Sequence, residues 1–126
     1  MYAVIAVATG AALGALLRWA LGLAFNPVFP TIPMGTLASN LIGGYLVGVA
    51  VSYFGANASL APEWRLFAIT GFLGGLTTFS TFSAEVVGLM RSGQLAWALA
   101  EAAVHMLGSF VMTAAGMYTI YLLSRR

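Results

Sequence analysis

The stretch GFLGGLTTFSTFS, from Gly71 to Ser83, decides the architecture of this chain. It places three closely spaced glycines and five hydroxyl side chains inside an otherwise apolar region. Glycine leaves a helix backbone unshielded and hydroxyls compete for its hydrogen bonds, so the stretch predicts a local break in a helix. In a bilayer such a break survives only inside protein or beside a polar cavity. Two interpretations stay open: an ion or substrate site, or a kinked and tightly packed helix.

The composition of the whole chain is that of a membrane protein. Of its 126 residues, 61% are hydrophobic and only 6% are charged, with neither Lys nor Asp. The mean hydropathy is +0.97. Cysteine is absent, which excludes disulfides and thiolate metal sites. The net charge of +2 is too small and too scattered to indicate nucleic-acid binding.

Turn residues divide the chain into four apolar segments, each near the length of about 20 residues that crosses a bilayer. The expected spans are residues 4–24, 34–55, 65–90 and 96–123, with the third broken near its middle. They predict a single all-α transmembrane domain over residues 1–126. The connections are short, so neighbouring helices should be antiparallel. The N-terminus lacks a basic n-region, so we interpret it as the first span and not as a signal peptide.

The arginines carry little information about orientation in the membrane. Arg65, Arg125 and Arg126 are expected on the side of the two termini, and Arg18 and Arg91 on the other. Orientation follows the asymmetry of Lys and Arg, and three against two is nearly balanced. The chain therefore either inserts both ways, which permits an antiparallel homodimer, or is oriented by a bias of one arginine or by cellular factors.

Small residues are spaced for close helix packing on the first two spans. Gly10 and Gly14 form one GxxxG pair, and Gly44 and Gly48 form another. Such pairs let helix backbones approach closely inside a membrane. On their own they indicate packing rather than function.

Polar side chains form stripes on the second and fourth spans. Thr36 and Asn40 share one helix face, and His105, Ser109 and Thr113 follow one another a turn apart. An amide in the middle of a membrane helix needs a partner, whereas hydroxyls often bond back to a carbonyl one turn earlier. The stripes therefore indicate either a polar track shared between helices or local bonding within each helix.

The side chains after the break narrow the kind of solute. Phe79 and Phe82 are three residues apart and share a face. Ring edges carry partial positive charge and attract an anion weakly, although such phenylalanines also serve as packing residues. A permeating ion must replace hydration worth on the order of 20 kcal/mol. Hydroxyls, one amide and ring edges, without a ring of acids in mid-span, favour a small hard anion over a metal cation.

Three charged residues have two interpretations each. Arg18 either sets a positive potential at a pore mouth or extends to the membrane interface. Glu85, one turn after Thr81, is a vestibule or interface residue. Glu101 is likewise a vestibule or interface residue, and of these we expect an interface position or an ion pair with Arg91.

Three motifs resemble the fluoride channel family known as Fluc or CrcB. They are GALLRW at Gly14–Trp19, GTLASNLIG at Gly35–Gly43, and the break followed by TFSTFS within Gly71–Ser83. Their order and the four-span length agree over essentially the whole chain. The resemblance implies a passive fluoride exporter of the bacterial cytoplasmic (inner) membrane that protects the cell from fluoride toxicity. It also implies an antiparallel dual-topology homodimer in lipid, with two pores.

The resemblance also implies residue roles, each carried over onto a matching position. Phe79 and Phe82 would line the fluoride path, Asn40 would orient them and bind the ion, and Arg18 would lie in the vestibule. Ser109 and Thr113, with Thr36 on the second span, would complete the polar lining of the pore. The backbone carbonyls of Gly74 and Thr77 would hold a structural sodium ion at the dimer centre.

Three other classes of protein fit the sequence less well. A small multidrug exporter needs an acid in its first span, and residues 4–24 contain none. A scaffold subunit would leave Asn40 and the hydroxyls of the third and fourth spans without a purpose. An enzyme would have to use His105 and Ser109 on one helix, with no G-x-S-x-G elbow or orienting acid.

Overall fold

The computed structural model describes all 126 residues, which form helices joined by short turns. Four candidate membrane spans, Tyr2–Val28, Met34–Ala56, Pro62–Arg91 and Leu95–Ser124, are long and apolar enough to cross a bilayer. The predicted all-α fold with four membrane-crossing helices is confirmed. The elements are α1 (Tyr2–Phe25), η1 (Asn26–Val28), α2 (Met34–Ala56), α3 (Pro62–Arg65), η2 (Leu66–Leu73), α4 (Gly74–Leu76), α5 (Phe79–Arg91) and α6 (Leu95–Ser124).

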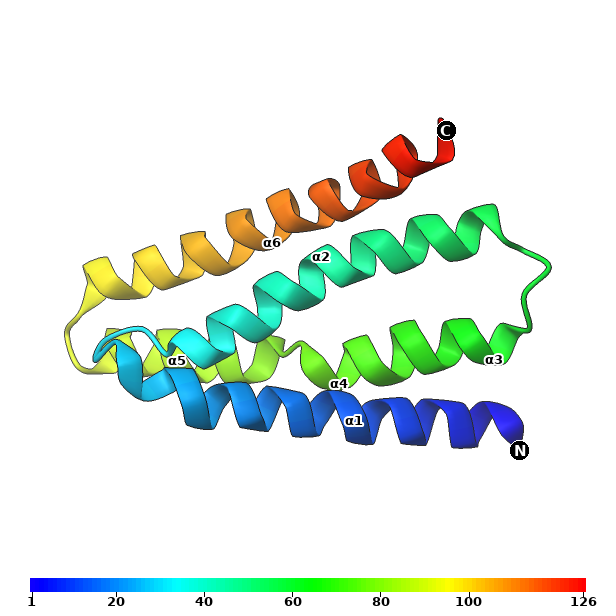
Figure 1. Ribbon diagram of the computed structural model, residues 1–126. Helices are drawn as coiled ribbons and strands as arrows, with labels where there is room; N and C mark the ends of the chain where they lie inside the picture. The colour runs from blue at the N-terminus through cyan, green and yellow to red at the C-terminus, as the bar shows by residue number, and fades with distance from the viewer.

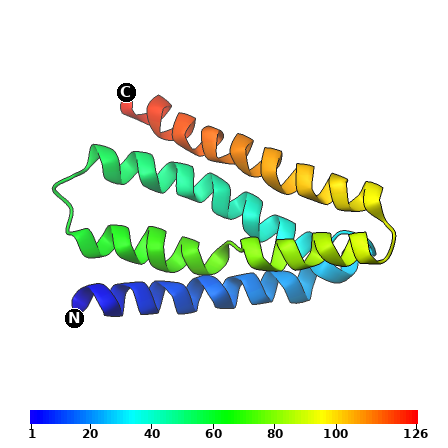
Figure 2. The same cartoon turned by 180° about the vertical axis from the view of Figure 1, so that it is seen from behind.

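The four spans run alternately up and down. Both termini and the turn between α2 and α3 lie at one end of the molecule, and the other two connections lie at the opposite end (Figure 1). The packing follows two pairs: α1 lies along the third span, and α2 lies along α6 (Figure 2). The expected antiparallel arrangement of neighbours is confirmed.

Local chemistry explains where the spans begin and turn. The Asn26 side chain accepts hydrogen bonds from the backbone N–H groups of Gly35 and Thr36, at 2.7 and 3.1 Å, and so caps the start of α2. Gly93 adopts a φ of 78° between α5 and α6, a conformation that glycine tolerates without strain. These features shape the two turns at the end of the bundle opposite the chain termini.

The third span is built from unlike pieces. η2 is a π-helix of eight residues, a rare form that is often found near functional sites. It leads into the short α4, after which the backbone of Thr77 and Thr78 is extended, with φ and ψ of −87° and 154°, and −151° and 118°. α5 then begins at Phe79, where the Thr78 side chain accepts from the Thr81 N–H. The predicted break is present, and it consists of these two threonines.

The glycines before the break have a different role from the one expected. Gly71 lies in η2, and Gly74 and Gly75 lie in α4, all before the chain leaves its helical path. A Cβ at Gly71 would lie 2.7 Å from the Val7 carbonyl oxygen, and one at Gly75 would lie 3.0 Å from the Ala15 nitrogen. Two of the three glycines therefore serve close packing against α1, and they do not themselves form the break.

Both GxxxG pairs also lie at close helix contacts, as predicted. A Cβ at Gly14 would overlap the Phe72 carbonyl oxygen, and one at Gly48 would overlap the Thr113 carbonyl oxygen. The first pair brings α1 onto η2 and α4, and the second brings α2 onto α6. Small residues thus position the break between its neighbours.

We predict that Gly14→Ala destabilises the protein. The added methyl group meets backbone atoms, including the Leu76 nitrogen at 2.8 Å, which cannot give way as a side chain can. Overpacking of this kind costs about 1–3 kcal/mol, so the midpoint of thermal unfolding in detergent should fall. Gly55→Ala is the matched control, because its Cβ meets nothing within 4 Å. Equal midpoints for the two variants would contradict the packing role of Gly14.

Candidate functional site

A groove of about 460 Å³ opens on the bundle at the helix break. Residues from α2, the third span and α6 line it: Asn40, Gly43, Gly44, Val47, Ile69, Leu73, Gly74, Thr77, Thr78, Phe79, Phe82, His105, Met106, Ser109 and Phe110. Six of the residues predicted from the sequence are therefore gathered at one place: Asn40, Gly74, Thr77, Phe79, Phe82 and Ser109. The other four, Arg18, Thr36, Glu85 and Thr113, lie outside its lining.

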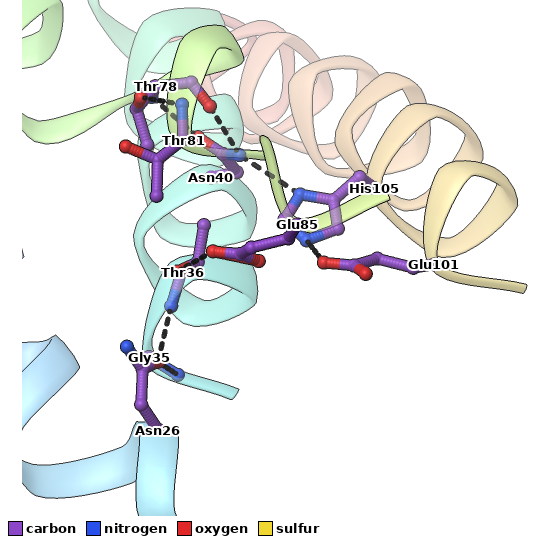
Figure 3. Close-up of polar contacts among 9 residues, drawn as sticks. All are labelled: Asn26, Gly35, Thr36, Asn40, Thr78, Thr81, Glu85, Glu101 and His105. Atoms are coloured by element: carbon purple, nitrogen blue, oxygen red, sulfur yellow. Dashed lines mark hydrogen bonds and ion pairs between the residues drawn. The ribbon is translucent and has the colours of Figure 1, made fainter. Parts of the chain in front are cut away.

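Asn40 bonds both backbone groups of Thr78 in the break (Figure 3). Its Oδ1 accepts from the Thr78 N–H at 2.8 Å, and its Nδ2 donates to the Thr78 carbonyl at 3.0 Å. The extended conformation removes the N–H and C=O groups of Thr78 from helical hydrogen bonding. The side chain of Asn40, on α2, provides the hydrogen-bond partners for both groups. This is the partner that the sequence required for the mid-span amide, and it also fixes which way the amide faces.

The orientation of Asn40 determines the state of His105. Asn40 Nδ2 also lies 3.0 Å from His105 Nδ1, and an amide nitrogen only donates. Nδ1 must therefore accept, so the neutral ring carries its proton on Nε2. The imidazole in turn stacks on the Phe82 ring, with 4.4 Å between centroids and 26° between planes. His105 thus links the amide at the break to a phenylalanine of the groove.

The two phenylalanines meet edge to face at the start of α5. Their centroids are 5.5 Å apart and their planes are inclined by 71°. Phe82 is 6% exposed, whereas Phe79 is 76% exposed. Both rings line the groove, and Phe79 is open to whatever covers the groove from outside.

Hydroxyls of the polar stripes have separate uses. Ser109 lines the groove. Thr113 donates to the Gly44 carbonyl of α2 at 3.0 Å, and not to a carbonyl of its own helix. Thr77 does bond one turn back, to the Leu73 carbonyl at 2.8 Å. Among these hydroxyls, Thr113 bonds across helices, and only Thr77 of the third span bonds back within its own segment.

Arg18 lies against the break. Its Nε donates to the Gly75 carbonyl oxygen at 3.0 Å, and the side chain is half-buried. The guanidinium therefore bonds a carbonyl on the third span, beside the break.

A buried acidic group lies beside the groove. Thr36 donates to Glu85 Oε1 at 2.6 Å, which joins α2 to α5. Glu101 is 0% exposed, and its Oε1 lies 3.9 Å from His105 Nε2 (Figure 3). The expected interface position of Glu101, or its ion pair with Arg91, is wrong, because the residue faces the interior one turn before His105. Carboxylate and imidazole atoms of Glu85, Glu101 and His105 lie within 4.8 Å of one another and could hold a metal ion.

The carbonyls expected to bind sodium have lost their helical donors. In a continuous helix the Thr78 N–H would bond Gly74, and the Thr81 N–H would bond Thr77. Here the Thr78 N–H donates to Asn40 instead, and the Thr81 N–H donates to Thr78 Oγ1 at 3.1 Å. Gly74 and Thr77 therefore have carbonyl oxygens released from the helix, which is the chemistry a hard cation needs.

Several residues of this site were missed or misassigned from the sequence. Thr78 and Gly75 act through backbone groups, which no side-chain pattern indicates. Glu101 and His105 did carry a signal, since they are four residues apart and must share a helix face. That spacing could have placed Glu101 inside the bundle.

Comparison with known proteins is consistent over almost the whole chain. The family described as CrcB-like protein, Camphor Resistance (CrcB), matches residues 5–117. A protein of Tolumonas auensis named fluoride-specific ion channel FluC is 62% identical over 125 residues, which cover 99% of this chain and 98% of that protein. Proteins with the same name from Pseudomonas putida and Burkholderia cenocepacia are 57% and 61% identical and cover 97% and 94% of this chain, and 96% and 92% of their own lengths. The chain belongs to the CrcB family.

Proposed function

We propose that this protein is a fluoride-specific passive ion channel that exports fluoride and so protects the cell from fluoride toxicity. The relatives that carry this name match nearly the full length of the chain at 57% to 62% identity. The observation that carries the proposal is the groove at the helix break, where Asn40, Ser109 and two phenylalanines meet. Such a protein is a transporter and not an enzyme.

The groove offers an anion many weak partners and no strong one. A hydroxyl from Ser109 and ring edges from Phe79 and Phe82 are spread along it, and no lysine or arginine lines it. Weak successive sites let an ion enter and also leave. Arg18 adds positive potential near the groove, because it bonds the carbonyl of Gly75, which follows the groove residue Gly74 in the sequence. Thr36 and Glu85, bonded to each other beside this path, form its vestibule.

The open groove supports an antiparallel homodimer. Lipid cannot satisfy released carbonyls or hydroxyls, so the open side of the break needs a protein cover at membrane depth. A second copy of the chain supplies one, and the five arginines, three against two in the expected topology, give only a weak orientation bias. In this assembly two dual-topology subunits, each a single transmembrane domain of residues 1–126, form two pores in the lipid of a bacterial cytoplasmic membrane.

A structural sodium ion at the centre of this dimer would use the carbonyls of Gly74 and Thr77. Both carbonyls lie at the break, and their usual N–H donors bond side chains instead. Both residues also line the open groove that the second subunit would cover. Sodium would supply positive charge that neutralises these dipoles and holds the two breaks together.

The proposed function is tested by fluoride efflux from liposomes that contain the purified protein, with a potassium ionophore to carry the balancing charge. We expect rapid fluoride release and no comparable chloride release. Phe82→Ile should lower the fluoride rate by about tenfold or more, equivalent to about 1.4 kcal/mol, because it removes a ring edge from the path. Phe25→Ile is the control, since Phe25 lies outside the groove and is 46% exposed. Absence of efflux from verified, dimeric protein would refute the channel.

Dual topology is tested by adding two lysines at the N-terminus. Three arginines already flank the end that holds both termini, so the lysines should bias insertion strongly toward one orientation. We expect cells that express only this variant to lose fluoride resistance, and co-expression with an oppositely biased variant to restore it. Full resistance from the single biased variant would argue against antiparallel assembly.

The sodium proposal predicts ion-specific stability. Binding of an ion at 100 times its dissociation constant stabilises the bound state by about 2.7 kcal/mol. The unfolding midpoint of the purified dimer should therefore be higher in sodium chloride than in N-methyl-D-glucamine chloride at equal ionic strength. Potassium chloride serves as the control for monovalent cations in general. Identical midpoints in all three salts would speak against a bound sodium ion.

A further inference from the structure

Unsatisfied polar atoms in this protein are concentrated in one place. Five buried side-chain atoms have no hydrogen-bond partner, and four of them belong to the cluster of Glu85, Glu101 and His105. They are Glu85 Oε2, both carboxylate oxygens of Glu101, and His105 Nε2. A buried polar group without a partner costs about 1–3 kcal/mol, and more when it is charged. Each of the three residues has a possible ligand atom within 4.8 Å of those of the other two, so these unpartnered atoms indicate a missing ligand.

The chemistry of the cluster points to a cation. Two carboxyl groups and an imidazole face one another here, and Glu101 is 0% exposed. No arginine or lysine side chain bonds either carboxylate. A metal cation supplies the positive partner that such buried carboxylates need in order to be ionised. Carboxylate oxygens combined with an imidazole nitrogen form a ligand set typical of divalent transition metals such as zinc.

We propose that Glu85, Glu101 and His105 form a binding site for a divalent transition-metal ion, with zinc as the representative ligand. Their candidate ligand atoms lie within 4.8 Å of one another, and atoms around one zinc ion lie about 3.4 Å apart. Side-chain rotations of the two glutamates close this difference. Glu85 is half-buried and leaves the cluster an approach, while Glu101 and His105 form its closed interior.

Metal binding at this site is coupled to the groove through His105. A metal on Nε2 needs the lone pair of that nitrogen, so the ring proton has to move to Nδ1. Nδ1 then no longer accepts the hydrogen bond from Asn40 Nδ2, which now measures 3.0 Å. The Asn40 amide cannot simply turn over, because Thr78 bonds both of its ends. Zinc binding therefore separates Asn40 from His105. Because the His105 ring stacks on Phe82, that stacking is disturbed as well.

The consequence for transport rests on the proposed function. If fluoride passes Asn40 and Phe82, zinc at the cluster should slow fluoride flux. The binding site itself does not depend on that function, so binding and flux are measured separately.

Zinc binding is measured by equilibrium dialysis of the purified protein in detergent, and cobalt absorption gives a second readout of an imidazole and carboxylate site. We expect one zinc ion per chain. Glu101→Gln and His105→Asn should each weaken binding by at least about tenfold, the loss caused even by removing a group that only orients a ligand. The Asn side chain keeps an oxygen where Nδ1 lies but has no atom at the Nε2 position. Glu63→Gln, at the opposite end of the third span, is the control for adventitious carboxylate binding.

Unchanged zinc binding in both cluster variants, or an equal loss in Glu63→Gln, would overturn the site. For the coupling, fluoride efflux is recorded with and without zinc, and each variant is compared with its own zinc-free rate. We expect zinc to slow the wild-type protein by about tenfold, magnesium to have no effect, a chelator to restore the rate, and Glu101→Gln to be insensitive. Zinc binding that leaves efflux unchanged would overturn the coupling to Asn40. A protein that binds zinc but never conducts fluoride would refute the proposed function and leave the site intact.

Discussion

The two hydrogen bonds between the Asn40 amide and the backbone of Thr78 are the interaction on which the rest of the site depends. A membrane helix that opens at mid-span leaves backbone groups that lipid cannot satisfy, at a cost of several kcal/mol for each group. A side-chain amide provides one acceptor and two donors, so it can replace both lost helical bonds and still donate a third. That third bond goes to His105 and so links the break to α6.

The packing of small residues makes this interaction possible. Gly10 on α1 meets Gly71 on the third span, Gly14 meets the backbone of Phe72 and Leu76, and Gly75 meets that of Ala11 and Ala15, with almost no space between the backbones. The same close approach brings Arg18 within hydrogen-bond distance of the Gly75 carbonyl. The glycines that precede the break thus contribute rigidity on one side, while the threonines open the other side toward α2 and α6. In this way a multi-pass membrane protein of 126 residues forms a polar groove between helices that are otherwise largely apolar.

Charge is arranged around the groove rather than within it. Arg18 lies behind the break, and Glu85 and Glu101 lie beside Phe82 and His105, but none of these three lines the groove. The ring edges and hydroxyls that do line it carry only partial charges. A pathway for a small hard anion needs this separation, since a full positive charge in the path would hold the ion, and a full negative charge would repel it.

Composition and spacing were enough to predict four apolar helices, the break in the third, and the face shared by Asn40 and Thr36, because hydrophobic length and helical period act locally. Which groups meet across helices was decided only when the spans packed. The partner of Asn40 is a backbone unit that carries no side-chain signal, Arg18 turned inward to a carbonyl, and Glu101 faces His105 inside the bundle rather than Arg91 at its end. Each of these depends on the register between helices, which the glycine contacts set by steric fit. Sequence spacing along a single helix does not contain that register.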